Sequence, residues 1–489
     1  EFHCTIIAIA PSPVNPDVVW VGTDDGNVQV TRDGGKTWTN VVKNIQGLAP
    51  NAWIPSVEAS RVDAGTAYVA ADHHRENDYA PYFFKTTDYG QTWTTLTVGT
   101  ARTAGWSHVI REDPKNRSIL YAGTELGIWV SFDGGARWTS MRNNMPPAPV
   151  RDIKIHPRDN DIIAATHGRG VYIMDRVAAV QQLGEAMKAD AFLFDIAPAV
   201  RWSVWRNDGN LGQRVYEAPN PPQGAVIDYY LKDEAKDGPV MTIADKSGKT
   251  LRTLRNLPKA AGVNRATWDL HLDGPRQPGA ERRDGDEEGF GRFGATGPWA
   301  LPGDYTVTLS VAGREMKRTV TVEMDPRTEV PMSDLTEQLE TALVLRDLTE
   351  RVTTTIDRTN DVILQLTQLS DRVKPGGPDA SSPNARAVNE LATATIELLK
   401  TLRDEQMVRP VAGLGYRQYP RLREEVQSVY GMVTRPPNRP TDGQALRTKE
   451  LLQETDTVVG SLNRILTEQV GKLNQLLGST PRISAPPVK

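Results

Sequence analysis

Three aspartates recur at the same place in a repeated motif, and they are the first residues to consider for chemistry. The motif is Ser/Thr-x-Asp-x-Gly-x-x-Trp, written TRDGGKTW, TTDYGQTW and SFDGGARW from residues 31, 86 and 131. An aspartate carboxylate can act as a nucleophile or as a general acid or base. A catalytic site, however, brings dissimilar residues together once, whereas this motif occurs three times.

The repetition instead favours a structural role at a hairpin turn. The carboxylate can accept hydrogen bonds from the free backbone N–H groups of the turn. The glycine supplies a positive φ, and the indole ring can pack between neighbouring sheets. We therefore predict a structural role for Asp33, Gly35, Trp38, Asp88, Gly90, Trp93, Asp133, Gly135 and Trp138.

Bulk composition excludes several classes of protein. The 489 residues carry 57 Lys and Arg against 61 Asp and Glu, so no overall charge attracts nucleic acid or anionic lipid. The length predicts several domains. A single cysteine, Cys4, cannot form an intramolecular disulfide. No apolar run is long enough to span a bilayer, and the first residues read as a strand rather than as a signal peptide.

Residues 1–180 read as about four β-propeller blades. The motif spacings of 55 and 45 residues fit the length of a four-stranded blade. Each copy follows an apolar strand (VVWVGT, TAYVAAD, ILYAGT), a turn and a third strand. A fourth unit at 150–175 keeps three strands and lacks the motif. We expect these blades to be part of a larger propeller.

In the rest of the chain, the spacing at which apolar residues recur changes twice. Residues 190–328 alternate at period two between Gly, Pro and Asp turns, which predicts a β-sandwich. Apolar residues from 335 to 356 then recur at helical spacing after Ser333, and the stretch ends at KPGGP. Further helical stretches at 384–404, 420–434 and 442–478 predict a helical bundle over 332–478. We expect the tail, 479–489, to be disordered.

The repeats resemble a known family. Phrases such as SPVNPDVVWVGTDDGNVQVTRDGGKTWTNV, IREDPKN and IHPRDNDIIAATHGRGVYIMD are similar to the Asp-box (BNR) repeats of sialidases, sortilin/VPS10 propellers and xyloglucan-cleaving propeller glycosidases. The best match is a bacterial group of large exported proteins with a sortilin-like propeller, often labelled glycosyl hydrolase. The segment GVNRATWDLHLDG…LPGDYTVTLSVAGR resembles the FlgD-type Ig-like domain.

This resemblance implies an exported protein, secreted or at the periplasm or cell surface. Such propellers have more blades than the four found here, which implies either that another chain (an upstream polypeptide, or a second copy in an oligomer) supplies the rest or that this sequence is a C-terminal part of a longer one. It also implies that the functional face lies opposite the repeated turns. The turns between second and third strands lie there, and they carry the ligand-binding candidates Asp24, His73, His74, Arg75, His167 and Arg169, together with Asp25, Glu76 and Glu125, with His108 close by.

Three functions remain open for this face. Asp25 and Glu125 are weak candidates for the carboxylate pair of a glycosidase acting on polysaccharide. His73, His74 and Asp78 have metal-ligating side chains, although adjacent histidines in a charged loop are usually solvated. A surface that binds protein or peptide needs no catalytic set. We therefore expect non-catalytic binding or assembly of a larger extracytoplasmic complex, with no metal and no cofactor.

Overall fold

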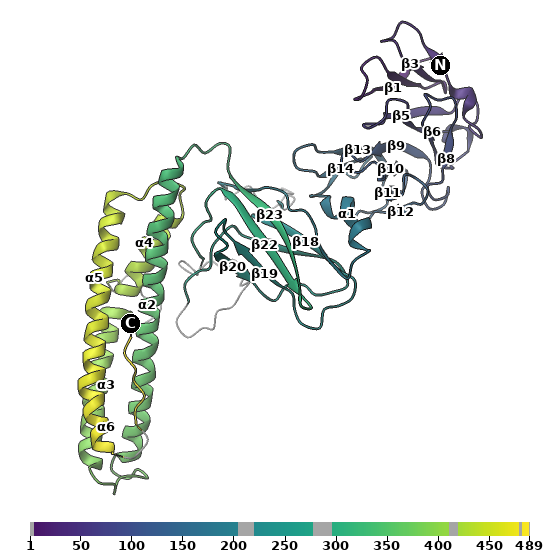
Figure 1. Cartoon of the computed structure of the whole chain (residues 1–489). Coiled ribbons are helices and arrows are strands. Elements are labelled where there is room, and N and C mark those ends of the chain that lie inside the picture. Colours follow the sequence, from purple (N-terminus) through teal and green to yellow (C-terminus); the bar gives the residue numbers. More distant parts are fainter. Residues whose placement is uncertain (1–3, 204–219, 277–295, 410–418, 479–481, 489) are drawn as a thin grey trace. The chain divides into compact units, whose positions relative to one another are not determined.

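Short strands separated by turns fold the first part of the chain into four successive antiparallel sheets (Figure 1). The computed structural model describes residues 4–203, 220–276, 296–409, 419–478 and 482–488. These residues divide into two units, the first comprising Glu1–Ala197 and Asp228–Lys232 and the second Pro198–Ile227 and Asp233–Lys489. The protein is thus mainly β, with a helical C-terminal part.

Each sheet of the first unit is a meander in which strands adjacent in sequence are adjacent in space, as in a propeller blade. The fourth sheet has three strands among the described residues, as the sequence predicts. The strands are β1 (Ile6–Pro11), β2 (Val19–Thr23), β3 (Val28–Thr31) and β4 (Thr39–Asn40); β5 (Trp53–Ala59), β6 (Ala67–Asp72), β7 (Tyr82–Thr86) and β8 (Thr94–Leu96); β9 (Ser107–Glu112), β10 (Leu120–Thr124), β11 (Gly127–Ser131) and β12 (Thr139–Ser140); β13 (Val150–Ile155), β14 (Ile162–Thr166) and β15 (Val171–Met174).

Apolar clusters join these sheets in chain order. Trp20 and Ile54 lie in the cluster between the first and second sheets, and Tyr121 and Ile153 in the one between the third and fourth. A third cluster joins the second sheet to the third. Gly22 allows close approach, because a Cβ there would lie 2.5 Å from Ile54 Cγ2. These clusters thus join the four sheets one to the next.

The three repeated turns have the same hydrogen bonds. In the second copy Asp88 Oδ1 accepts from Thr86 Oγ1 at 2.8 Å and from the backbone N–H of Thr92 at 2.9 Å. Its Oδ2 accepts from Thr92 Oγ1 at 2.6 Å, and Thr86 Oγ1 accepts from the N–H of Gly90 at 2.9 Å. The first and third copies repeat this pattern, with an arginine side chain replacing the second hydroxyl donor in the third. The carboxylate therefore closes the turn.

Replacing Asp88 by alanine should lower the free energy of unfolding of the first unit by about 1–2 kcal/mol, because three donors lose their acceptor. The hydrogen bonds from Thr92 also lower the pKa of Asp88, so the contribution of the carboxylate should be lost as the pH falls below its ordinary range. Denaturant unfolding followed by tryptophan fluorescence measures both effects. Thr87→Ala, in the same turn, is the matched control and should change stability by less than about 0.5 kcal/mol; equal effects would contradict the prediction.

The first unit ends with the helix α1 (Ala178–Ala186) and the strand β16 (Ala191–Leu193). β16 pairs antiparallel with the second half of β18 (Ala225–Leu231). The second unit contains a five-stranded sheet, in which β17 pairs parallel to β23 and the other neighbours are antiparallel. Its strands in spatial order are β17 (Ala199–Arg201), β23 (Arg314–Met324), β22 (Gly303–Val311), β19 (Val240–Ala244) and β20 (Thr250–Leu254). From β21 (Gly262–Trp268), Trp268 is fully buried with its ring edge against Tyr305.

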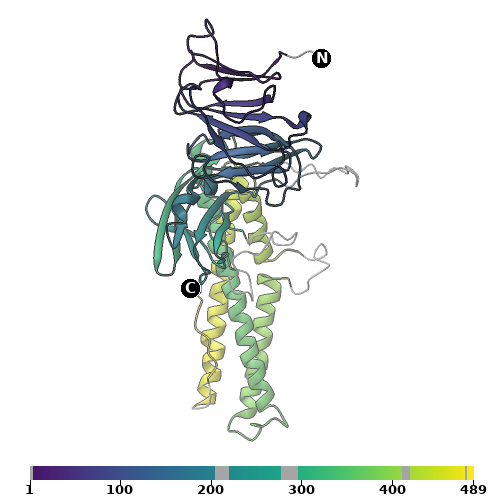
Figure 2. The ribbon, with the colours of Figure 1, turned by 90° about the vertical axis from the view of Figure 1, so that its right-hand side faces the viewer.

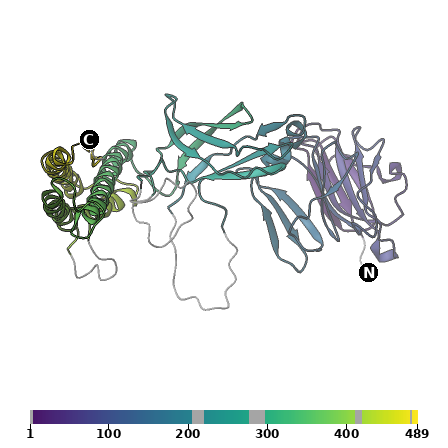
Figure 3. The same cartoon turned by 90° about the horizontal axis from the view of Figure 1, so that it is seen from below.

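The C-terminal part of the second unit is helical. Its helices are α2 (Met332–Val373), α3 (Ala385–Leu402), α4 (Leu422–Thr434), α5 (Asp442–Ile465) and α6 (Gly471–Leu477), with π-helical turns at Arg403–Met407 and Leu466–Val470. They lie side by side along much of their length (Figures 2 and 3) and share one apolar cluster. Among the described residues, no helix combines the length and apolar character needed to cross a bilayer.

The tail differs from the expectation of disorder. Residues 482–488 are described, and both Ile483 and Val488 are buried in the apolar cluster of the helices. The remaining positions of the predicted tail, 479–481 and 489, lie outside the described residues. Proline and small polar residues made this stretch look unstructured, but two buried apolar side chains and hydrogen bonds to its backbone hold it against the helices.

Candidate functional site

The turns between second and third strands lie at the end of each sheet opposite the repeated turns. In the first sheet, β3 begins after the 24–27 turn and ends at Thr31, where the repeated turn begins. The connections between sheets reach the same end, since Ser107 at the start of β9 pairs with Thr124 at the end of β10. Trp106 and Glu125 therefore lie together at this end.

We call this region the histidine face and define it by Asp72, His74, Trp106, His108 and Glu125. Trp106 lies at its centre, with the imidazole of His74 stacked on the indole at 4.7 Å between ring centroids and 17° between planes. The ring of His108 meets the indole edge-on at 6.1 Å. Tyr79, which is exposed, lies 5.7 Å from Trp106. The indole itself is partly exposed, so this aromatic stack reaches the surface.

Asp72 fixes the orientation of His74. The Nδ1 atom of His74 lies 2.7 and 2.9 Å from the two carboxylate oxygens of Asp72, and the backbone N–H of His74 donates to the same carboxylate. Asp72 is buried, at the end of β6. Because the carboxylate accepts, Nδ1 carries a proton, and Nε2 is the atom of His74 that can accept a proton or a hydrogen bond.

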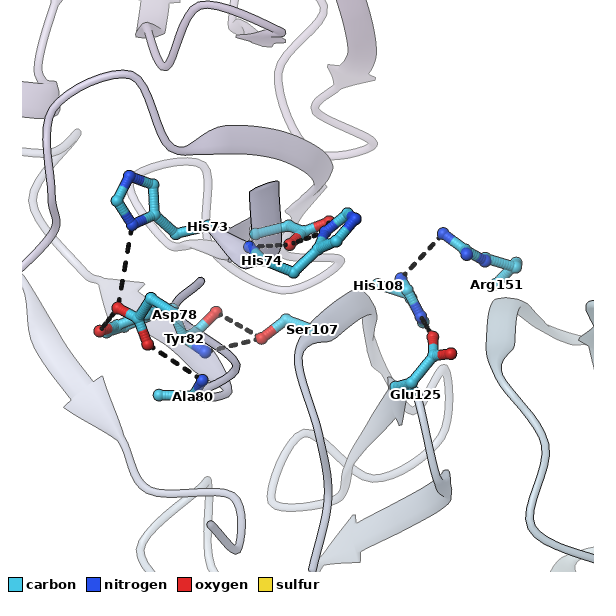
Figure 4. Close-up of polar contacts among 10 residues, drawn as sticks. His73, His74, Asp78, Ala80, Tyr82, Ser107, His108, Glu125 and Arg151 are labelled. Carbon is cyan, nitrogen blue, oxygen red and sulfur yellow. Dashed lines mark hydrogen bonds and ion pairs between the residues drawn. The ribbon is translucent and has the colours of Figure 1, made fainter. Parts of the chain in front are cut away.

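His108 is buried between two charged side chains (Figure 4). Its Nε2 lies 2.8 Å from Glu125 Oε2, and its Nδ1 lies 3.3 Å from Nη1 of Arg151. A guanidinium can only donate, so Nδ1 must accept and Nε2 must carry the single ring proton. The hydrogen bonds therefore require a neutral imidazole that donates to Glu125 and accepts from Arg151.

The electrostatics of this pair follow from burial. Burial lowers the pKa of His108 to about 3, and the positive charge of Arg151 adds to this effect. Burial also raises the pKa of Glu125, while Arg151 opposes that shift. The contact between His108 and Glu125 is thus a hydrogen bond from a neutral ring rather than an ion pair.

The predicted ligand-binding residues of the 72–78 turn separate in the structure. His73 points away from His74 toward Asp78, with 3.8 Å between His73 Nδ1 and Asp78 Oδ2 (Figure 4). The guanidinium of Arg75 lies over the ring of Trp53, 3.5 Å from its centroid. Of the predicted ligand-binding residues in this turn, only His74 therefore belongs to the histidine face.

The other predicted residues lie in their own turns. Asp24 accepts the backbone N–H groups of Cys4 and Thr5 at 2.9 and 2.7 Å, so its carboxylate ties the start of the chain to this turn. His167 and Arg169 are exposed in the turn between β14 and β15. His167 is close enough to contribute to the lowered pKa of His108.

The residues predicted for a carboxylate pair or a metal site have separate partners in the structure. No hydrogen bond or ion pair of the described residues joins Asp25, in the first sheet, to Glu125, in the third. Within the described parts of the chain, no group of three or more His, Cys, Asp or Glu is placed to hold a metal ion. His73 and His74 contact different carboxylates, which separates the proposed ligands.

Four residues of this region were missed by sequence reasoning. Asp72 closes a strand, Tyr79 follows the predicted turn, Trp106 precedes β9, and Arg151 begins the fourth sheet. A signal existed for Trp106, because it stands outside the repeated motif and directly before a strand. The contact of Arg151 with His108 depends on the pairing of separate sheets, which no local pattern shows.

Comparison with known proteins gives limited matches. No model of a known protein family matches the chain. A curated protein, xyloglucanase Xgh74A of Acetivibrio thermocellus, is 25% identical over 138 residues, which cover 26% of this chain and 16% of the xyloglucanase. The chain thus matches about a sixth of the length of that relative.

Solved structures are similar only at low scores. The structure of YCF48 bound to D1 peptide has a TM-score of 0.26 and 14% identity, covering 51% of this chain and 68% of that one. The GH74 enzyme of Niastella koreensis has a TM-score of 0.30 and 16% identity, covering 64% of this chain and 45% of that one. The GH74 xyloglucanase of Xanthomonas campestris has a TM-score of 0.27 and 14% identity, covering the same shares. The propeller-like description of this chain rests on its own succession of antiparallel sheets.

Proposed function

We propose that this chain is a non-catalytic binding protein whose histidine face takes up a protein or peptide segment. The observation that carries this proposal is the partly exposed stack of His74, Trp106 and Tyr79. Trp, Tyr and Arg are the residues most enriched at the energetic centres of protein interfaces. Arg151, which contacts His108, is exposed and would add hydrogen bonds to backbone carbonyls or carboxylates.

The carboxylates of this region also favour binding over catalysis. Asp72 is held by His74, Glu125 by His108, and Asp24 by two backbone N–H groups. A glycosidase needs two carboxyl groups at a defined separation, one as acid and the other as nucleophile or base. The raised pKa of Glu125 suits an acid, and Asp72 is close enough to add to that shift, but each of these two carboxylates is already bound to a histidine.

Replacing Trp106 by alanine should remove peptide binding at this face. Random dodecapeptides displayed on phage are selected on the immobilised full chain, and the selected peptides are titrated by fluorescence anisotropy. We expect Trp106→Ala to weaken these peptides about 30-fold or more, since truncating a central aromatic residue costs about 2 kcal/mol or more. The matched control is Trp38→Ala, an exposed tryptophan of the first repeated turn, which should leave the affinity unchanged.

Two results would sink this proposal. The first is equal binding of the selected peptides to the wild-type chain and to a folded Trp106→Ala variant, which would place the binding surface elsewhere. Alternatively, the chain would release reducing ends from xyloglucan, with Glu125→Gln abolishing the activity. That second outcome would establish the glycoside hydrolase that the match to xyloglucanase Xgh74A suggests.

The outer faces of the first and fourth sheets support an assembly role. Ile7 and Ile9 of β1 are exposed, and Ile9 is 66% exposed. On β15, Val171 and Ile173 are also exposed, at 62% and 59%. Apolar patches of this kind mark interaction surfaces. We propose that further sheets, from an upstream polypeptide or a second copy, cover these exposed residues. The proposal is wrong if the native protein has the mass of a monomer and no other chain copurifies with it.

The remaining assignments follow the resemblance described above. We propose that the sheets of the first unit are sortilin-like Asp-box blades and that 190–328 is a FlgD-type Ig-like sandwich, supported by its five-stranded sheet and the buried Trp268. The helices of 332–478 share one core, as expected for a bundle. We place the protein outside the cytoplasm; detection of the native protein only in the cytoplasmic fraction would overturn that placement.

A further inference from the structure

The C-terminal tail is held against the helices by paired hydrogen bonds to its backbone. Asn474 binds both the N–H and the C=O of Ile483, at 2.8 and 3.1 Å. Gln365 binds the N–H and C=O of Ser484 at 2.9 and 3.1 Å. Asn463 does the same for Val488, at 2.9 Å each. Three side-chain amides therefore take the place that a neighbouring strand has in a sheet.

The tail runs antiparallel to the last helical stretch, as Figure 1 shows. Residue 483 meets Asn474 and residue 488 meets Asn463, so the tail advances as the helix number decreases. Five extended residues span about 16 Å. Eleven helical residues, from 463 to 474, also rise about 16 Å. We call the three side-chain amides that bind the tail amide clamps. Two of them, those of Asn463 and Asn474, are thus spaced to match an extended peptide.

Side chains add selectivity to this backbone recognition. Ile483 and Val488 are buried in the helical apolar cluster, whereas Ser484, Pro486 and Pro487 face outward. Proline has no N–H to satisfy, so the two prolines need no clamp between the anchored ends. Gln365 is also oriented, because its Nε2 donates to Asp361 Oδ2 at 3.0 Å and its Oε1 is left to accept from the tail.

We propose that this groove is a peptide-binding site, and that the tail is its built-in, displaceable occupant. The groove is defined by the side-chain amides of Gln365, Asn463 and Asn474 and by two apolar sockets, the sites in which Ile483 and Val488 are buried. The ligand in trans would be an extended segment of a partner protein, with two aliphatic residues five positions apart and proline between them. Amide clamps of this kind read the extended backbone, and the sockets read the spacing of the aliphatic side chains.

Tethering determines how strongly the tail competes. A segment attached by a short linker acts at an effective concentration of the order of 1 mM. A free peptide with a Kd of about 10–100 µM would therefore bind the occupied groove roughly 10- to 100-fold more weakly than the vacant one. A partner segment must therefore bind the groove strongly enough to displace the tethered tail, so the tail sets the minimum affinity that a partner needs.

The test compares the wild-type full chain with an Ile483→Asp/Val488→Asp variant, in which the tail leaves the sockets and the helices are unchanged. The probe is a fluorescein-labelled peptide with the sequence of residues 482–488, followed by anisotropy. We expect the probe to bind the variant at least tenfold more tightly than the wild type. Adding Asn463→Ala to the variant should weaken binding tenfold or more, whereas Gln453→Ala, exposed on the same helix, should not.

Hydrogen exchange of the wild-type chain gives a second readout should the variant lose helicity. The amides of Ile483 and Val488 should exchange by local opening, faster than those of Leu462, and excess unlabelled peptide should accelerate them further. Exchange of the tail only on global unfolding of the helices would overturn the proposal. So would absence of probe binding to a variant that keeps its helical circular dichroism.

Discussion

Replacing Glu112 by alanine should lower the free energy of unfolding of the first unit by about 3–5 kcal/mol. Glu112 ends β9 in the third sheet and is buried, yet the donors to its carboxylate all come from β6 of the second sheet or from the connection between β5 and β6. Its carboxylate accepts from Ser60 Oγ at 3.0 and 2.9 Å, from the backbone N–H of Arg61 at 2.7 Å and from Tyr68 Oη at 3.1 Å. The alanine variant would leave these donors buried without an acceptor.

Hydrogen exchange of peptides from β6 and β9 measures this effect within the first unit. A whole-chain unfolding curve, by contrast, would report the unfolding of both units together. Glu112→Gln keeps the volume and one acceptor oxygen, so its effect should be about half as large. The exposed Glu76→Ala is the matched control and should change stability by less than about 0.5 kcal/mol. A loss below about 1 kcal/mol for Glu112→Ala would show that water satisfies the donors.

The adjacent residue, Asp113, makes a second link, from the third sheet to residues that follow it in the chain. It accepts from Gln181 Nε2 of α1 at 3.0 and 2.9 Å and from Tyr121 Oη at 2.9 Å. Gln181 in turn exchanges hydrogen bonds with Asn160, next to the fourth sheet. Two consecutive carboxylates therefore tie the third sheet to its second-sheet neighbour and to the helix that follows the fourth.

The local features of this fold could be predicted because short segments specify them. The repeated motif marked the three turns, since one carboxylate, one hydroxyl and one glycine within seven residues form each of them. Apolar periodicity and the Pro and Gly breaks predicted helical stretches at 384–404, 420–434 and 442–478, and α3, α4 and α5 begin at 385, 422 and 442. Each of these signals lies within the segment that it shapes.

The links between segments could not be predicted, because they depend on which sheets meet. Glu112 and Asp113 stand in IREDP, where a charged pair before proline is typical of a solvated turn. His108 was placed near a loop, but it lies buried inside β9. Its partner Arg151 is 43 residues away, and the clamps of the tail come from residues up to 119 positions away. Burial of a polar side chain is decided by these distant neighbours.

His108 should make the first unit lose stability as the pH falls from about 6.5 toward 3. Its pKa is lowered by burial to about 3, so in this window the unfolded chain binds a proton that the folded chain does not. The free energy of unfolding should fall by about 1.4 kcal/mol per pH unit from this group, or about 3–5 kcal/mol in all. The groups that face the ring are Arg151, Glu125, His74 and His167.

Glu125 affects the pH dependence of the unfolding free energy in the opposite direction. It therefore determines the pH range in which the effect of His108 can be measured alone. Its raised pKa means that the folded chain holds a proton more tightly, so it contributes stability that is lost as the pH rises above 4.5. The two effects oppose each other as the pH falls from the raised pKa of Glu125 to 4.5, and below 4.5 the histidine acts alone within this pair. His108→Gln keeps a donor toward Glu125 and removes the titration. The difference in unfolding free energy between wild type and His108→Gln should therefore shrink steadily below pH 4.5, and parallel pH profiles would show that the ring is protonated in the folded protein.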